Sequence, residues 1–160
     1  MKIVSLVPSI TETLFDFDLG NNLIGRTKFY IHPKEQVAQI EIIGGTKTLN
    51  LDKIKALNPD LIIANKEENV KEQVAVLQND FNVWVTDIPG LPSLQAFFIS
   101  LGERTQRQQQ GEYFAKQLAD WLPFNTVFQS AKGGLSHLAK SVYGGGRRYF
   151  FPQHTHAFRF

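Results

Sequence analysis

The chain has 160 residues, which is long enough for one domain with its own hydrophobic core. Hydrophobic residues make up 42% of it, charged residues 20%, and the net charge is +2, so the composition is that of a globular protein. The absence of cysteine excludes disulfides, cysteine-ligated zinc and thiol catalysis, and no apolar run is long enough for a transmembrane helix.

The first residues predict a strand followed by a helix. Residues 2–7 are a short β-rich run, and Pro8 with the polar residues after it interrupts this run too early for a signal peptide. We therefore expect no export signal in the chain as given. Ser9 and Glu12 have the spacing of a capping box, which predicts a helix that starts there and stops near Gly20.

Strands and helices alternate along the next hundred residues. The fully apolar run of residues 61–64 is typical of a strand buried in a parallel sheet. Further strands are predicted over residues 23–26, 40–43 and 83–86, and helices over 50–57, 70–81, 94–101 and 107–122, the last two split near Gly102. This alternation indicates βαβ units, so the predicted fold class is α/β, a Rossmann-like parallel sheet with flanking helices.

Several segments of the chain carry a family resemblance through their order and spacing. They cover residues 3–12, 25–29, 31–33, 44–47, 53–64 and 83–85. Together they resemble the substrate-binding proteins of ABC importers for cobalamin, haem and ferric siderophores, the helical-backbone periplasmic-binding family. No single segment is decisive, but the ordered set matches over residues 2–123.

The resemblance implies two α/β lobes joined by a long linking helix, with the ligand in the cleft between them. We accordingly divide the chain into a first lobe (1–102), a linking-helix region (103–130) and a tail (131–160), with the second lobe missing. The implied function is a non-enzymatic binding component for cobalamin or an iron chelate, and we expect it to be inactive or weak in this truncated form, because half of the cleft is missing. Its implied partners are that small molecule and an ABC permease, and its implied location is the periplasm or the cell surface. A cytoplasmic corrinoid-handling protein of the same fold is the alternative, favoured by the lack of an export signal.

Ligands of open α/β sheets bind beyond the carboxyl ends of the strands, and this rule selects the same loops as the resemblance. The candidate ligand-binding residues in these loops are Pro8, Ser9, Arg26, Phe29, Tyr30, His32, Gly45, Thr46 and Asn65. Ser9 begins a helix whose N-terminus suits an anionic group, and Arg26 suits a carboxylate or phosphate. Phe29 and Tyr30 suit the wall of an apolar cleft.

Each candidate also has a purely structural interpretation. His32 either stacks on or ligates the bound chelate, or it anchors a loop before Pro33. Phe29 and Tyr30 are alternatively loop anchors, and similar proteins tend to have Cys where Tyr30 stands. Arg26 is alternatively part of a solvated face.

Three carboxylates follow the strand at 61–64 and have a separate implied role. In the family, a surface Glu of the lobe docks onto Arg of the membrane permease, and Glu67, Glu68 and Glu72 occupy the matching loop and helix start. Acids in the first turn of a helix also complement the helix dipole without any partner.

The sequence contains no recognisable catalytic constellation. Ser9 has no His in a known motif, no Walker-type phosphate loop is present, and the carboxylates are scattered. We therefore expect no catalytic residues, no resident cofactor and no metal site.

The last forty residues differ in composition from the rest. Residues 121–160 contain five Lys and Arg, no acid and three of the four His. A basic tail suits nucleic acid, but we expect no nucleic-acid partner, because the tail resembles an out-of-frame sequence. One inserted nucleotide in suitable codons converts the family's second-lobe strand, Lys-Val-Ala-Tyr-Leu-Ile-Trp-Arg-Asn-Pro-Tyr-Met, into residues 132–143. We therefore interpret residues 131–160 as a frameshifted, poorly ordered segment.

Overall fold

The structure, a computed structural model, describes residues 1–29 and 34–130, with side chains described for residues 1–29 and 35–120. Its centre is a five-stranded parallel sheet with the order β3-β2-β1-β4-β5. The strands are β1 (Ile3–Ser5), β2 (Leu23–Arg26), β3 (Glu41–Ile42), β4 (Leu61–Asn65) and β5 (Val83–Thr86). The predicted α/β class and the five predicted strand positions are confirmed. The predicted tail, residues 131–160, lies outside the described residues.

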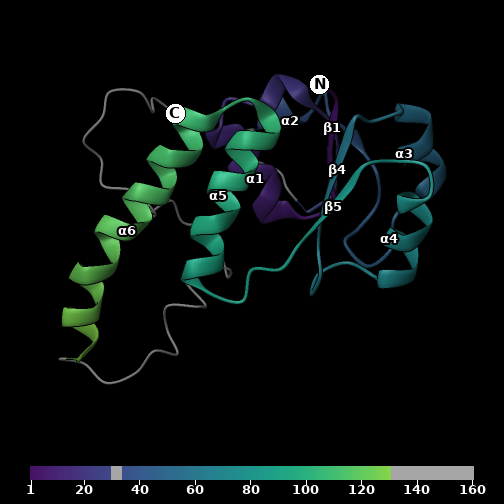
Figure 1. The fold of residues 1–160 in the computed structure, drawn as a ribbon. Helices are drawn as coiled ribbons and strands as arrows, with labels where there is room; N and C mark the ends of the chain where they lie inside the picture. Colours follow the sequence, from purple (N-terminus) through teal and green to yellow (C-terminus); the bar gives the residue numbers. More distant parts are fainter. Residues whose placement is uncertain (30–33, 131–160) are drawn as a thin grey trace.

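The helices cover both faces of this sheet (Figure 1). They are α1 (Pro8–Asp16), α2 (Lys34–Val37), α3 (Leu51–Leu57), α4 (Lys71–Gln78), α5 (Leu91–Thr105) and α6 (Gln108–Ser130), with a 3-10 turn η1 (Gly20–Asn22). Helices α3 and α4 lie on one side of the sheet, and α1 and α5 lie on the other with α6 outside them. Among the described residues, no helix is long and apolar enough to cross a membrane.

The start of α1 corrects the predicted capping box. The helix begins at Pro8 with Val7 as the N-cap, and no side chain caps it. Proline is well suited to the first helical turn because its missing N–H has no intrahelical partner there. Ser9 is therefore already inside the helix, where its carbonyl oxygen accepts from the Thr13 hydroxyl at 3.0 Å.

The break between α5 and α6 also differs from the prediction. The chain turns at Gln106, which adopts a left-handed φ of 59°, and Gly102 lies inside α5. A Cβ at Gly102 would lie 3.1 Å from the Cα of Gly111 and 2.8 Å from the Arg107 carbonyl oxygen. Glycine at position 102 thus permits two helices to approach closely and does not end either of them.

An aromatic cluster joins these two helices to the end of α1, which packs against the sheet. The Phe17 ring stacks on Phe114 of α6 at 4.9 Å and lies 6.1 Å from Phe98 of α5. All three side chains are buried. Such pairs contribute about 0.5–1.5 kcal/mol each beyond the area they bury. The aromatic contacts make α5 and the first half of α6 part of one core with the sheet.

Candidate functional site

The candidate site is the edge of the sheet where the parallel strands end. The connection order reverses between β1 and β4, so the loops that follow these two strands lead away in opposite directions. Ligands of open α/β sheets bind at such a point. The loops that meet here are residues 6–9, 27–29, 43–48, 66–70 and 87–90.

The loop after β4 is held by two asparagines. The Asn65 side-chain oxygen accepts from the backbone N–H groups of Glu67 at 2.9 Å and Glu68 at 3.3 Å. The Asn69 side chain accepts from the Asn65 N–H at 2.8 Å. Asn65, a predicted ligand residue, thus has its side-chain oxygen directed at its own loop.

Asn69 also reaches the two neighbouring loops. Its side-chain nitrogen donates to the carbonyl oxygens of Leu6, at the end of β1, and Thr46, after β3, both at 3.1 Å. Only 7% of Asn69 is exposed. Sequence reasoning placed this residue in the right loop but did not select it, since a buried amide that binds backbone carbonyls has no distinctive sequence pattern.

The loop after β3 is a tight turn that depends on glycine. Gly44 has a φ of +108° and forms an isolated antiparallel bridge with Leu49. The Gly45 N–H donates to the Thr48 carbonyl oxygen at 2.9 Å, which closes the turn. Thr46 is half-buried at its tip. The predicted turn at residues 44–46 is confirmed.

Phe29 lies beside this turn and faces solvent. Its side chain is 57% exposed, and a Cβ added at Gly45 would lie 3.3 Å from the ring. The Lys28 ammonium is 5.2 Å from the ring centroid. The structure therefore brings Phe29 and Gly45 together, as the sequence-based site requires. Tyr30 and His32, the other predicted members of this loop, lie outside the described residues.

Arg26 has a different place from the one that anion binding needs. It is only 6% exposed, and its Nε and Nη2 atoms donate to the Val37 carbonyl oxygen at 3.2 and 3.0 Å. Its Nη1 atom donates to the Thr27 carbonyl oxygen at 3.1 Å. Through these contacts Arg26 connects β2 to the segment before β3. Its position fits neither of the two predicted interpretations, an anion-binding residue or part of a solvated face.

Two buried hydroxyls, those of Ser5 and Thr11, hold the start of α1 in place. The Thr11 hydroxyl donates to Ser5 Oγ at 2.9 Å, and the Ser5 hydroxyl donates to the Val7 carbonyl oxygen at 3.0 Å. Both residues are fully buried, whereas Pro8 and Ser9 above them are half-buried. The first turn of α1 is thus held at the same edge as the other loops.

The predicted docking acids lie in the loop after β4 and in the first turn of α4. Glu67 and Glu72 are exposed and Glu68 is half-buried. Burial raises the pKa of Glu68, Lys47 opposes this rise, and Glu67 adds to it. The Lys47 ammonium also donates to the Glu67 carbonyl oxygen at 2.8 Å. The three acids share one turn and one helix start, as the sequence indicates.

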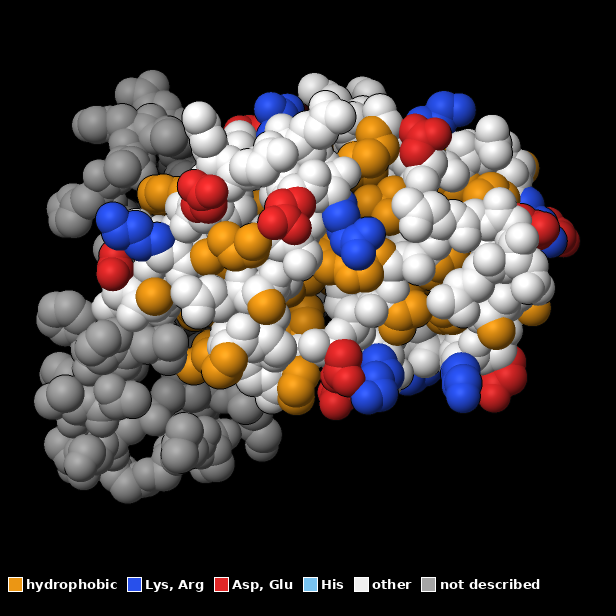
Figure 2. All heavy atoms as spheres, in the orientation of Figure 1, with side chains coloured by type: hydrophobic (Ala, Val, Ile, Leu, Met, Phe, Trp, Pro, Cys, Tyr) orange, Lys and Arg blue, Asp and Glu red, His pale blue; other side chains and the backbone are white. Residues whose placement is uncertain are grey.

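The charges of the described residues are mixed over the visible face of the molecule. Figure 2 shows Lys and Arg interspersed with Asp and Glu, often as neighbours, and no broad basic patch on the part of this face that is coloured. Lys66 and Asp87 form an ion pair at 2.6 Å, and this contact raises the pKa of Lys66. Within residues 1–29 and 34–120, no three potential metal-ligating side chains gather.

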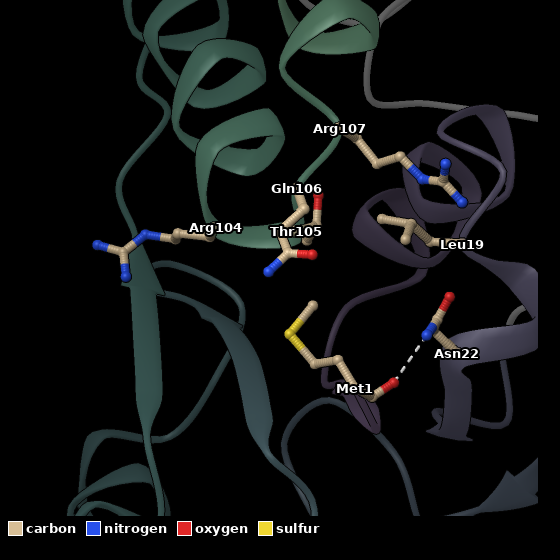
Figure 3. A pocket seen from close by; sticks show the side chains of 7 residues that line it. All are labelled: Met1, Leu19, Asn22, Arg104, Thr105, Gln106 and Arg107. Carbon is tan, nitrogen blue, oxygen red and sulfur yellow. Dashed lines mark hydrogen bonds between the residues drawn. The ribbon is translucent and has the colours of Figure 1, made fainter.

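A cavity of about 410 Å³ lies at the opposite edge, where β1 and β2 begin. Its lining combines residues that precede these strands with the end of α5 and the turn to α6, namely Met1, Leu19, Asn22, Arg104, Thr105, Gln106 and Arg107 (Figure 3). The Arg104 side chain points away from the other residues in this view, and its guanidinium lies 4.8 Å from the Trp84 ring. None of the predicted ligand residues that the structure describes lines this cavity.

Comparison with known proteins defines the class. The family model described as "Periplasmic binding protein" matches residues 3–122, and the chain belongs to this family. The vitamin B12-binding protein of Pectobacterium carotovorum subsp. carotovorum (strain PC1) is 27% identical over 151 residues, covering 93% of this chain and 50% of that protein. The chain thus spans about half the length of this relative.

Two further proteins are similar. The uncharacterized ABC transporter substrate-binding lipoprotein YvrC of Bacillus subtilis (strain 168) is 29% identical over 121 residues, 73% of this chain and 38% of that protein. The crystal structure of the periplasmic vitamin B12 binding protein BtuF of Vibrio cholerae superposes with a TM-score of 0.71 and 26% identity, covering 82% of this chain and 51% of that one. The predicted family is confirmed, and these relatives are binding proteins, not enzymes, by name.

Proposed function

We propose that this chain is the first lobe of an ABC-importer substrate-binding protein for cobalamin. The observation that carries the proposal is the similarity to a vitamin B12-binding protein over 93% of the chain. The parallel sheet supports it, because its loops converge on one edge where a ligand of this fold class would lie. An iron chelate, which the family resemblance also implies, is the competing ligand.

The proposed contact surface combines an aromatic ring with exposed backbone. Phe29 offers an exposed apolar face, Gly45 and Thr46 bring the backbone of the adjacent turn close to it, and Pro8 and Ser9 present the start of α1. Tyr30 and His32 complete the set from the sequence. Asn65 and Arg26 hold the loops in place, because their side chains bind backbone groups.

The second part of the proposal concerns the membrane partner. Glu67, Glu68 and Glu72 lie on the loop that follows β4 and on the first turn of α4. We propose that these acids dock onto basic residues of an ABC permease. The location that follows is the periplasm or the outer cell surface, which fractionation of cells that express the native gene would test.

Ligand binding is tested by titrating cyanocobalamin and haemin into the isotope-labelled chain and following its amide resonances. A cleft between two lobes covers the ligand from both sides, so we expect this chain alone to bind weakly. Cyanocobalamin should shift resonances of residues 28, 29 and 44–46. Shifts that are confined to the residues around Arg107 would contradict the proposed ligand edge, and micromolar or tighter binding would contradict the expectation that half of the cleft binds weakly or not at all.

A matched pair of variants sharpens this test. Phe29→Ala removes an exposed ring at the proposed site, and Tyr113→Ala removes a ring of similar exposure (42%) from α6. We expect the first change to weaken cyanocobalamin binding and the second to leave it unaltered. Equal effects of both changes would mean that the ligand does not contact the carboxyl edge.

A further inference from the structure

The two proposed functional surfaces of this lobe share one buried side chain. Asn69 donates to the Leu6 and Thr46 carbonyl oxygens, which belong to loops on the ligand side. The same side chain accepts from the Asn65 N–H, and Asn65 in turn holds the backbone of Glu67 and Glu68. A continuous chain of hydrogen bonds therefore leads from the ligand-side loops to the acidic turn.

We propose that Asn69 is a positioning residue that couples the ligand-side loops to the acidic turn at residues 67–68. A displacement of the Thr46 turn moves the Asn69 amide, and this amide carries the acidic turn with it. The functional meaning of this coupling rests on the proposed ligand edge and docking turn, whereas the coupling itself is a property of the lobe alone.

Three features make this amide suited to the role. It is buried, so that water does not compete for its bonds, and buried polar groups are costly to leave unpaired. It uses both its donor and its acceptor groups, and the three bonds go to the end of β4, to the loop after β1 and to the turn after β3. The contacts are to backbone atoms, so they depend on loop position and not on the identity of the side chains there.

A second, exposed link runs in parallel and has to be removed first. The Lys47 ammonium donates to the Glu67 carbonyl oxygen at 2.8 Å from the same turn that contains Thr46. Lys47 is exposed, so its bond is open to competition from water. The Gln73 side chain also binds this turn, accepting from the Leu49 N–H at 2.8 Å and donating to the Lys47 carbonyl oxygen at 3.0 Å, but it belongs to α4 and not to the acidic turn. Lys47→Met in the full 160-residue chain therefore leaves Asn69 as the side-chain link that leads to residues 67–68, and this variant is the parent for the test.

The experiment is a double-mutant cycle read by amide chemical shifts. Gly45→Ala perturbs the ligand-side turn, because the added Cβ approaches the Phe29 ring to 3.3 Å. In the Lys47→Met parent, this change should shift the amide resonances of Glu67 and Glu68. Asn69→Asp keeps the acceptor for the Asn65 N–H but replaces the two donations by carboxylate oxygens, so the shift should be lost in that background.

Asn69→Asp separates positioning from local support. If Asn69 only supports its own turn, the shift at Glu67 and Glu68 should persist after this change, because the bond from the Asn65 N–H remains. Asn69→Ala removes all three bonds without adding a charge and serves if the first variant does not fold. Asn79→Asp makes the same chemical change at the exposed end of α4 and should leave the transmitted shift intact.

Two results would overturn the proposal. One is that Gly45→Ala leaves the resonances of Glu67 and Glu68 unmoved in the parent, and the other is an equal shift with and without Asn69. The docking proposal fails on a separate readout, namely unchanged binding of Glu67→Gln and Glu68→Gln variants to vesicles that carry a cobalamin ABC permease. The coupling and the docking can therefore fail independently.

Discussion

Two adjacent glycines at the proposed ligand edge should respond very differently to the same substitution. Gly44 has a φ of +108°, a backbone conformation that side-chain-bearing residues rarely adopt, and Gly45 does not share it. A Cβ at Gly44 would lie 2.4 Å from the Thr48 carbonyl oxygen. The nearest described atoms to a Cβ at Gly45 would belong to the Phe29 ring, at 3.3 Å, and to the Lys28 side chain, at 3.6 Å.

The magnitudes follow from two opposing effects. Alanine restricts the unfolded chain, which stabilises the folded state by about 0.4–1 kcal/mol wherever the native backbone tolerates it. A residue forced into a sparsely populated conformation costs about 1–3 kcal/mol, and at Gly44 the contact with Thr48 adds to this cost. We expect Gly44→Ala to lower the free energy of unfolding by about 2 kcal/mol and Gly45→Ala to change it by less than about 1 kcal/mol.

Urea unfolding of both variants, followed by circular dichroism, measures the difference. For a domain of this size, about 2 kcal/mol corresponds to a fall in Tm of about 4–8 °C. Gly45→Ala is the control, because it adds the same methyl group one residue away in the same turn. A Gly44→Ala protein as stable as the Gly45→Ala protein would refute the assignment of this turn to a glycine-dependent conformation.

Three further changes test other parts of the lobe by urea unfolding. Asn50→Ala should cost about 1 kcal/mol, because the Asn50 side chain caps α3 through the Lys53 N–H at 3.0 Å, and a Ser replacement should restore most of it. Arg26→Lys should cost about 1–3 kcal/mol, because one ammonium cannot replace the fork that reaches Val37 and Thr27; an unchanged stability would argue against this connection. Asp16→Asn should stabilise the protein above pH 7, by at most about 4 kcal/mol, and leave it unaltered below pH 4.

The sign of the Asp16 effect follows from its surroundings. Burial, with the nearby carboxylates of Glu12 and Asp18, raises the pKa of Asp16 from 3.8 to about 7. The unfolded chain therefore releases this proton at lower pH than the folded one, so stability falls as the pH rises from about 4 to about 7. The profile of Asp16→Asn should lack this fall, and identical pH profiles for the two proteins would contradict the raised pKa.

The strands and the glycine turn could be predicted from the sequence, whereas the hydrogen-bond partners of the polar side chains could not. The apolar run of β4 and the glycine pair before Thr46 each require one local structure, and both predictions are confirmed. The start of α1 was misassigned because Pro8 and Ser9 both suit a helix N-terminus, and tertiary position decides between them. Arg26 was misjudged because its partner is the Val37 carbonyl, eleven residues away, and a backbone acceptor leaves no trace in the residue types.

The hydrogen-bond partners of these polar side chains determine what kind of ligand the carboxyl edge of the sheet can bind. Arg26, Asn65 and Asn69 direct their polar groups at backbone carbonyls and N–H groups. Among the described residues of the edge, the most exposed large hydrophobic side chain is Phe29, and Gly45 lies beside it. An edge of this kind favours contact with a broad face of a large ligand over pairing with a single strong charge, which agrees with the proposed preference for a corrinoid. Phe29→Leu, which keeps apolar area but removes the flat ring, should therefore weaken cyanocobalamin binding less than Phe29→Ala does, and the reverse order would argue against contact through this face.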